Sequence, residues 1–379
     1  ALRDPNATGP AFAAQADALQ RRAAELTALY EKVIALQPQS VEARVSLAEV
    51  NFVFLSQFEM AEILLKQALE IDSASPKALI AMAEFQFFFK GDRAAAIQRI
   101  EQALSTRPGH PDLSITLADL LTGASLKPED FARAKAQLTQ ALQLAPQNGD
   151  LRYMLASVWY RESLLDPKQM DHAKAGQALE MFQALLQERP DPELLVEVVQ
   201  LLQSLGKLPE ARGLIEQGIA KFPDEAHLRL LSGDLWLAAG AKALDQGQPS
   251  PETEQAEAIY RALLTPAQLS RLVTGQQVQL YYNLGLLSAL KAQAAKAQPP
   301  QALAHYQEAE KMYRQAMAIF DRINIINSPL QLELAKTLEA IGQLQASQGP
   351  AQAADYYRQA CGFKLESSCN WLKQQGLGP

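Results

Sequence analysis

Apolar and small residues recur along this chain at helical spacing, and the arrangement repeats about every 35 residues. The clearest copies are the pairs Leu47-Ala48, Met82-Ala83 and Leu117-Ala118. After the first pair, a small, a large apolar and a second small residue follow at Ala61, Leu65 and Ala68. Steps of three or four residues place side chains on one helix face, so the pattern predicts two closely packed helices in each unit.

The small residue that begins the second helix marks about eight such units. These residues are Ala61, Ala96, Ala134, Ala178, Ala211, Ala256, Ala309 and Ala353. Where their spacing exceeds 35 residues, segments rich in Gly, Pro, Lys and Gln are inserted, near 123–128, 165–176, 240–252 and 291–301. Each insertion is expected between the first and the second helix of its unit, so all should project from one edge of the array.

The ends of the chain differ from the repeated part. Residues 1–10 are polar and interrupted by Pro and Gly, which predicts an extended arm, and residues 11–38 form one long amphipathic pattern typical of a capping helix. The arm carries an apolar and a basic side chain, Leu2 and Arg3, near its start. We expect these to dock on a neighbouring copy of the protein; the alternative is an arm that folds back on the capping helix.

A two-helix unit with these small and large positions resembles the tetratricopeptide repeat (TPR), over residues 39–360. The resemblance implies an all-α fold, a right-handed α-solenoid of stacked helix–turn–helix repeats. It also implies a non-catalytic protein that binds proteins or peptide segments. The expected fold therefore places function on the surface of the stack rather than in an enclosed active site.

Residues 361–379 should form a C-terminal cap. Tyr356-Tyr357, Ala360-Cys361 and Ser368-Cys369 resemble one cysteine-bearing Sel1-like repeat. In exported members of that family such a pair forms a disulfide, so the resemblance implies a bridge between Cys361 and Cys369. The alternative is two reduced, buried thiols. A bridge favours an oxidising compartment and an exported protein, periplasmic or extracellular.

Charge and composition argue against other classes of function. The net charge is −7, and no run of Lys or Arg is longer than Arg21-Arg22, which disfavours nucleic acid as a partner. No apolar stretch reaches the ~20 residues of a membrane span. The four histidines are scattered, and no glycine-rich loop is present, so we expect no metal and no cofactor. Ser163 with Asp171-His172 could be drawn as a catalytic relay, but nothing positions a substrate there, so no catalytic residue is expected.

The first helices of successive units carry a recurring row of carboxylates flanked by apolar and aromatic residues. The expected groove residues are Val45, Glu49, Phe52, Ile80, Glu84, Phe87, Ile115, Asp119, Tyr153 and Tyr160. This row predicts an acidic concave groove for an apolar or basic segment of another protein, or of the protein's own copy. Two alternatives remain: a solvated acidic face, and a structural subunit of a head-to-tail homopolymer or extracellular filament.

Overall fold

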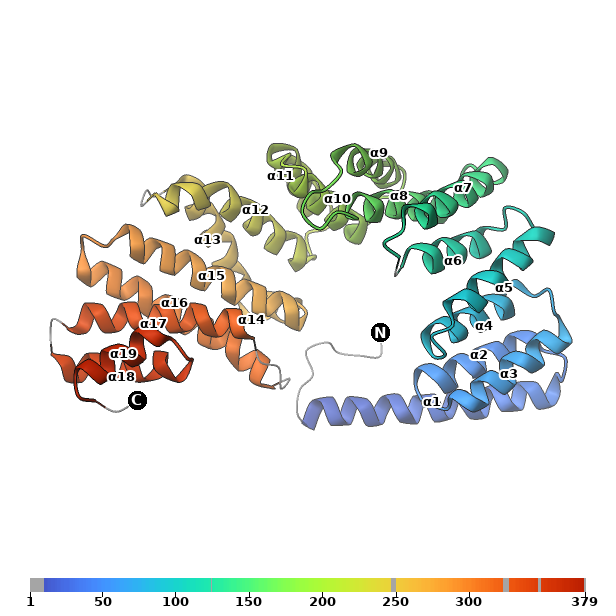
Figure 1. Ribbon diagram of the computed structural model, residues 1–379, viewed down its shortest axis with the longest axis horizontal. Coiled ribbons are helices and arrows are strands. Elements are labelled where there is room, and N and C mark those ends of the chain that lie inside the picture. The colour runs from blue at the N-terminus through green and yellow to red at the C-terminus, as the bar shows by residue number, and fades with distance from the viewer. Residues whose placement is uncertain (1–9, 124, 247–249, 323–326, 347–348, 378–379) are drawn as a thin grey trace. The chain divides into compact units, whose positions relative to one another are not determined.

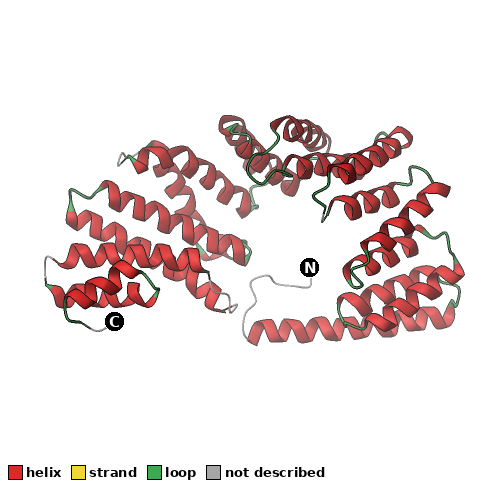
Figure 2. Ribbon diagram, viewed as in Figure 1, coloured by secondary structure: helices red, strands yellow, loops and turns green. Residues whose placement is uncertain are grey.

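In a computed structural model, the chain is described over residues 10–123, 125–246, 250–322, 327–346 and 349–377. These residues form nineteen helices and no strand (Figures 1 and 2). The predicted all-α solenoid of stacked helix pairs is confirmed. The chain divides into two compact units, Phe12–Leu194 and Leu195–Pro379, and each is described by itself.

Apart from α1, which has 27 residues, the helices of the first unit have 12 to 17 residues. The unit comprises α1 (Pro10–Leu36), α2 (Val41–Val53), α3 (Phe58–Ile71), α4 (Pro76–Phe88), α5 (Arg93–Thr106), α6 (Pro111–Thr122), α7 (Pro128–Leu144), α8 (Gly149–Ser163) and α9 (His172–Glu188). Many helices of both units begin where the sequence provides a cap. Ser40 and Ser75 accept hydrogen bonds from backbone N–H groups in the first turns of α2 and α4, which satisfies donors that the helix itself leaves unpaired.

The second unit contains four helices of 19 to 24 residues, α12, α15, α16 and α17, and one additional helix of four residues. The helices of this unit are α10 (Pro192–Ser204, which begins just before the unit boundary), α11 (Leu208–Lys221), α12 (Ala226–Asp245), α13 (Pro251–Leu263), α14 (Pro266–Leu269), α15 (Thr274–Ala294), α16 (Pro299–Arg322), α17 (Ser328–Ala346), α18 (Pro350–Gly362) and α19 (Glu366–Gln374). The short α14 is absent from the sequence interpretation. Residues 172–176, 240–245 and 291–294, which fall in the expected insertions, belong to α9, α12 and α15 and lengthen these helices.

The recurring alanines lie where the helices touch. All eight that begin the second helices are fully buried, at 0% exposure. A larger side chain at these positions would force the paired helices apart, because protein interiors are already close-packed. In unit 1 the first helices α2, α4, α6 and α8 also contact each other in sequence order. This packing brings residues 35 positions apart onto one common face.

Unit 2 uses glycine where unit 1 uses alanine. Three glycines each face the ring of a tyrosine on the following helix: Gly233 faces Tyr260, Gly285 faces Tyr313 and Gly342 faces Tyr357. A Cβ on Gly285 would lie 2.5 Å from the ring of Tyr313, which is closer than real Cβ contacts. The missing side chain therefore makes room for a buried aromatic ring.

Candidate functional site

The predicted row of carboxylates is assembled on the first helices of unit 1. Glu49 lies on α2, Glu84 on α4 and Asp119 on α6. Burial raises the pKa of Glu84, and the negative charges of Glu49 and Asp119 raise it further, so the three groups lie within electrostatic range. Burial also raises the pKa of Glu49, although the charge of Lys77 opposes this. We call these three residues the acidic row.

The members of the acidic row differ in how their charge is compensated. Asp119 forms an ion pair of 2.9 Å with Arg161 of α8. Lys77, near Glu49, already bonds to Glu42 at 2.9 Å. Glu84 makes no hydrogen bond or ion pair within the part of the chain that the structure describes. The centre of the row is therefore a half-buried carboxylate without a cation of its own.

A group of phenylalanines lies at the ends of α2 and α4 and at the start of α3. This phenylalanine cluster comprises Phe52, Phe58, Phe85, Phe87, Phe88 and Phe89. Ring centroids are 5.1 Å apart for Phe52 and Phe89 and 4.8 Å apart for Phe58 and Phe89. Phe58 and Phe89, whose rings are in contact, are each 41% exposed, and Phe88 is 70% exposed. Large aromatic side chains exposed together mark a surface that another molecule can cover.

The remaining predicted groove residues are only partly on the surface. Val45 is fully buried, so its placement in the groove is wrong: Tyr30 and Ile34 of the capping helix pack against the same core. Ile80 and Ile115 are partly buried against the core of α4 to α8. Tyr153 is 37% exposed, with its ring 5.5 Å from that of Phe182, and Tyr160 is partly buried.

The proposed docking residues Leu2 and Arg3 lie outside the described residues. On α1, which follows the arm, Leu29 and Leu36 are exposed at 54% and 74%. These leucines expose apolar surface on the first helix of the array. The docking of the arm stays a prediction.

Unit 2 contains a partly buried polar network that the sequence interpretation missed. Asp234 of α12 accepts hydrogen bonds from the Tyr260 hydroxyl at 2.7 Å and from the side-chain amides of Gln279 and Asn283, both at 2.6 Å. Burial raises the pKa of Asp234 to about 6. A signal was available, because Asp234 follows Ser232-Gly233 as Glu49 follows Leu47-Ala48.

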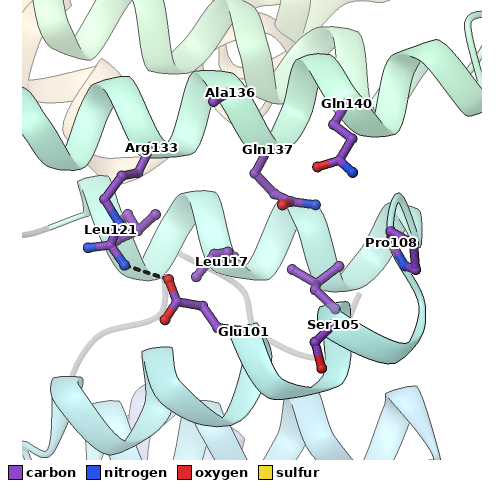
Figure 3. Close-up of a pocket in the computed structure, with 10 residues that line it drawn as sticks. Glu101, Ser105, Pro108, Leu117, Leu121, Arg133, Ala136, Gln137 and Gln140 are labelled. Carbon is purple, nitrogen blue, oxygen red and sulfur yellow. Dashed lines mark hydrogen bonds and ion pairs between the residues drawn. The ribbon is translucent and has the colours of Figure 1, made fainter.

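A pocket of about 530 Å³ opens between α5 and α7, with α6 as its floor (Figure 3). Leu117 and Leu121 form the floor, and Gln137 and Gln140 line the α7 side. Arg133 reaches across from α7 to Glu101 of α5, at 2.5 Å. The two charges at this pocket therefore neutralise each other, which leaves little to attract a charged ligand.

The residues considered for catalysis have structural partners. Asp171 caps α9, because its carboxylate accepts from the backbone N–H groups of Ala173 and Lys174. The Ser163 hydroxyl donates to the carbonyl of Tyr160 at 2.6 Å. Among the described residues, no group of three or more His, Cys, Asp and Glu side chains could hold a metal ion. None of the helices in the described ranges is long and apolar enough to cross a membrane.

Cys361 and Cys369 form a disulfide that joins α18 to the start of α19. The rings of Tyr357 and Trp371 stack beside it, with centroids 3.9 Å apart. The bridge implied by the Sel1-like resemblance is therefore present in the fold. The Sel1-like identity of this last helix pair stays a prediction.

Helix pairs stacked in this way, with small residues at the contacts, define an α-helical repeat protein. The sequence model of the tetratricopeptide repeat matches residues 124–166 and 199–245. These two segments of the chain thus match the tetratricopeptide repeat, as the residue pattern predicts. Repeats of this family are in general non-catalytic modules that bind other proteins.

Several solved structures are similar to this chain. A tetratricopeptide repeat protein from Parabacteroides merdae has 16% identity and a TM-score of 0.46, with 79% of this chain and 99% of that chain covered. The structure of pilF of Pseudomonas aeruginosa has 21% identity and a TM-score of 0.40, with 61% of this chain and 94% of that chain covered. A thermophilic tetratricopeptide repeat protein from Thermus thermophilus has 20% identity and a TM-score of 0.39, with 52% of this chain and 100% of that chain covered. No curated protein matches the sequence.

Proposed function

We propose that this protein is an interaction scaffold whose acidic row and phenylalanine cluster bind a segment of another protein with alternating basic and large apolar side chains. The observation that carries this proposal is Glu84. Its carboxylate is half-buried, lies between two other carboxylates and has no cation of its own among the described residues. A basic side chain from a partner would offset this repulsion, because an unpaired carboxylate removed from water is unfavourable.

The phenylalanine cluster supports the apolar half of the recognition. Phe52 and Phe87 stand one turn beyond Glu49 and Glu84 on the same helices, so acidic and aromatic side chains alternate along one face. Phe87 contacts the strongly exposed Phe88, with ring centroids 4.8 Å apart. Covering these rings would contribute about 25 cal/mol for each Å² of apolar surface removed from water.

Binding is tested with a synthetic peptide that alternates lysine with leucine and phenylalanine, followed by fluorescence anisotropy. We expect the double variant Glu49→Gln, Glu84→Gln to bind at least tenfold more weakly, a loss of about 1.4 kcal/mol. The matched control is Glu70→Gln with Glu180→Gln, two exposed acids of the same unit, which should change affinity less than twofold. Equal losses in both variants would mean that binding follows net charge, and the proposal would be wrong.

The partner segment can also come from a second copy of the protein, which gives the alternative of a head-to-tail homopolymer. The exposed Leu29 and Leu36 at the N-terminal end of the array support this alternative, because a stack of repeats leaves its end faces free to associate. Sedimentation velocity of the full chain, of a variant lacking residues 1–9 and of Leu29→Gln with Leu36→Gln provides the test. Assemblies that persist unchanged in both variants would refute it.

We further propose that the protein is exported to an oxidising compartment, periplasmic or extracellular. The bridge between Cys361 and Cys369 supports this, since such disulfides are rare where thiols are kept reduced. Intact-mass analysis after alkylation of the protein taken from its native source, under denaturing and non-reducing conditions, provides the test. Two alkylated thiols would contradict the proposal.

A further inference from the structure

A second pocket in unit 1 has the opposite charge from the acidic row. It has a volume of about 340 Å³ and lies between α5, the turn that joins α3 to α4, and the first turns of α4 and α6. One wall is formed by Arg99, Gln102, Ala103 and Thr106 of α5 and by Arg107, which directly follows this helix. The residues of α5 are spaced so that they share one helix face. Leu79 and Leu113 supply apolar surface, and Ser73 stands on the turn.

The two arginines of this pocket have no acidic partner. None of the residues that line it is Asp or Glu, and neither Arg99 nor Arg107 forms an ion pair within the described residues. In the described part of the chain, Arg99 donates only to the neutral Gln86 side chain, from Nε to Oε1 at 3.0 Å. Burial lowers the pKa of Arg99, as expected for a guanidinium that is partly removed from water without a counter-charge.

Other arginines in the same unit show the contrast. Four of them are each paired with a carboxylate: Arg93 with Asp130, Arg133 with Glu101, Arg152 with Glu188 and Arg161 with Asp119. The pocket between α5 and α7 contains one of these neutral pairs, whereas the pocket on the opposite face of α5 contains two unpaired guanidinium groups. A buried or half-buried guanidinium is most stable with an anion, which it holds through a planar set of N–H donors.

We propose that this pocket binds a small ligand that carries a carboxylate or a phosphate group. Arg99 and Arg107 hold the anionic group, Gln102 and Ser73 can donate further hydrogen bonds to it, and Leu79 with Leu113 contacts the apolar part of the ligand. Small-molecule sites commonly measure about 300–1,000 Å³, so a volume of this size suits a compact ligand or a single side chain. The site is independent of the acidic row, because it uses other residues and the opposite charge.

The test follows the methyl groups of Leu79 and Leu113 by NMR during titration of the full chain. The probes are inorganic phosphate and succinate, and sodium chloride at matched ionic strength reports non-specific salt effects. We expect saturable shifts at Leu79 and Leu113 with at least one of the two anions. The anion with the lower Kd identifies which of the two chemistries the site takes.

Arg99→Gln and Arg107→Gln should each weaken this binding at least tenfold. Arg133→Gln, which removes the same charge from the neighbouring pocket, should leave it within twofold. If Arg99→Gln does not fold, the test uses Arg99→Lys and Arg107→Gln instead, because Arg107 is exposed. Shifts that grow linearly, match those in sodium chloride or persist in both glutamine variants would overturn the proposal.

Discussion

The partly buried carboxylate of Asp234 predicts that the stability of unit 2 depends on pH. Its folded-state pKa of about 6 lies above the ordinary value of 3.8, because burial penalises the charged form more than the three neutral donors favour it. A group with a raised pKa contributes stability that is complete below its unfolded pKa and is lost as the pH rises through its folded pKa. The difference corresponds to about 3 kcal/mol, at about 1.4 kcal/mol for each pKa unit.

Asp234→Asn isolates this contribution, since it keeps the shape of the side chain and removes the charge. The new side-chain carbonyl can still accept from Tyr260 and Asn283, and the exposed Gln279 can rotate to offer its carbonyl to the new amide. We expect the stability of the wild-type protein, relative to the variant, to fall by about 2 kcal/mol between pH 4.5 and 7.5. The rest of the effect lies below pH 4.5.

Hydrogen exchange measures this stability difference helix by helix, which matters because repeat arrays need not unfold in one step. Amides of α12, α13 and α15 are compared between the wild-type protein and Asp234→Asn at each pH, after correction for intrinsic exchange. Amides of α2 and α4 in unit 1 provide the internal control and should not respond to the substitution. A stability difference in unit 2 that stays constant across this pH range would refute the electrostatic reasoning.

Two further predictions concern packing and the C-terminal bridge. Gly285→Ala should destabilise the protein by about 1–3 kcal/mol in urea unfolding, because its Cβ would overlap the Tyr313 ring. Gly213→Ala should instead stabilise α11 by about 0.5–1 kcal/mol in the same assay, because a Cβ at Gly213 meets open space. Replacing Cys361 and Cys369 by alanine should cost about 2 kcal/mol, confined to α18 and α19 in hydrogen exchange. Faster exchange throughout unit 2 would contradict that local role.

Periodicity alone determined the class of fold. A small residue that recurs about every 35 residues, or more where segments are inserted, is typical of helices that pack closely, and the alanines chosen on that basis are all fully buried. The same spacing placed Glu49, Glu84 and Asp119 on equivalent helices, and the structure brings their charges within range of each other. Local rules suffice here, because each repeat contacts mainly its neighbours.

The sequence could not predict how deeply each of the expected groove residues is buried. Val45 and Ile80 occupy equivalent positions, but only Val45 is fully buried, since the capping helix α1 packs against its core. The pattern within one repeat does not indicate which neighbouring helix packs against it. The exposure of Phe88 is likewise a consequence of where α4 ends, beside the turn at Gly91, and not of its residue type.

The tertiary structure decided which side chains meet in the Asp234 network and in the pocket that contains Arg99 and Arg107. The Asp234 network joins side chains from α12, α13 and α15, up to 49 residues apart, and the arginine pocket joins the turn at Ser73 to Arg107, directly after α5. Whether a charged side chain finds a partner depends on distances of a few ångströms between separate helices. The sequence specifies which helices form, but only their packing sets those distances and leaves Arg99 and Glu84 without a counter-charge among the described residues.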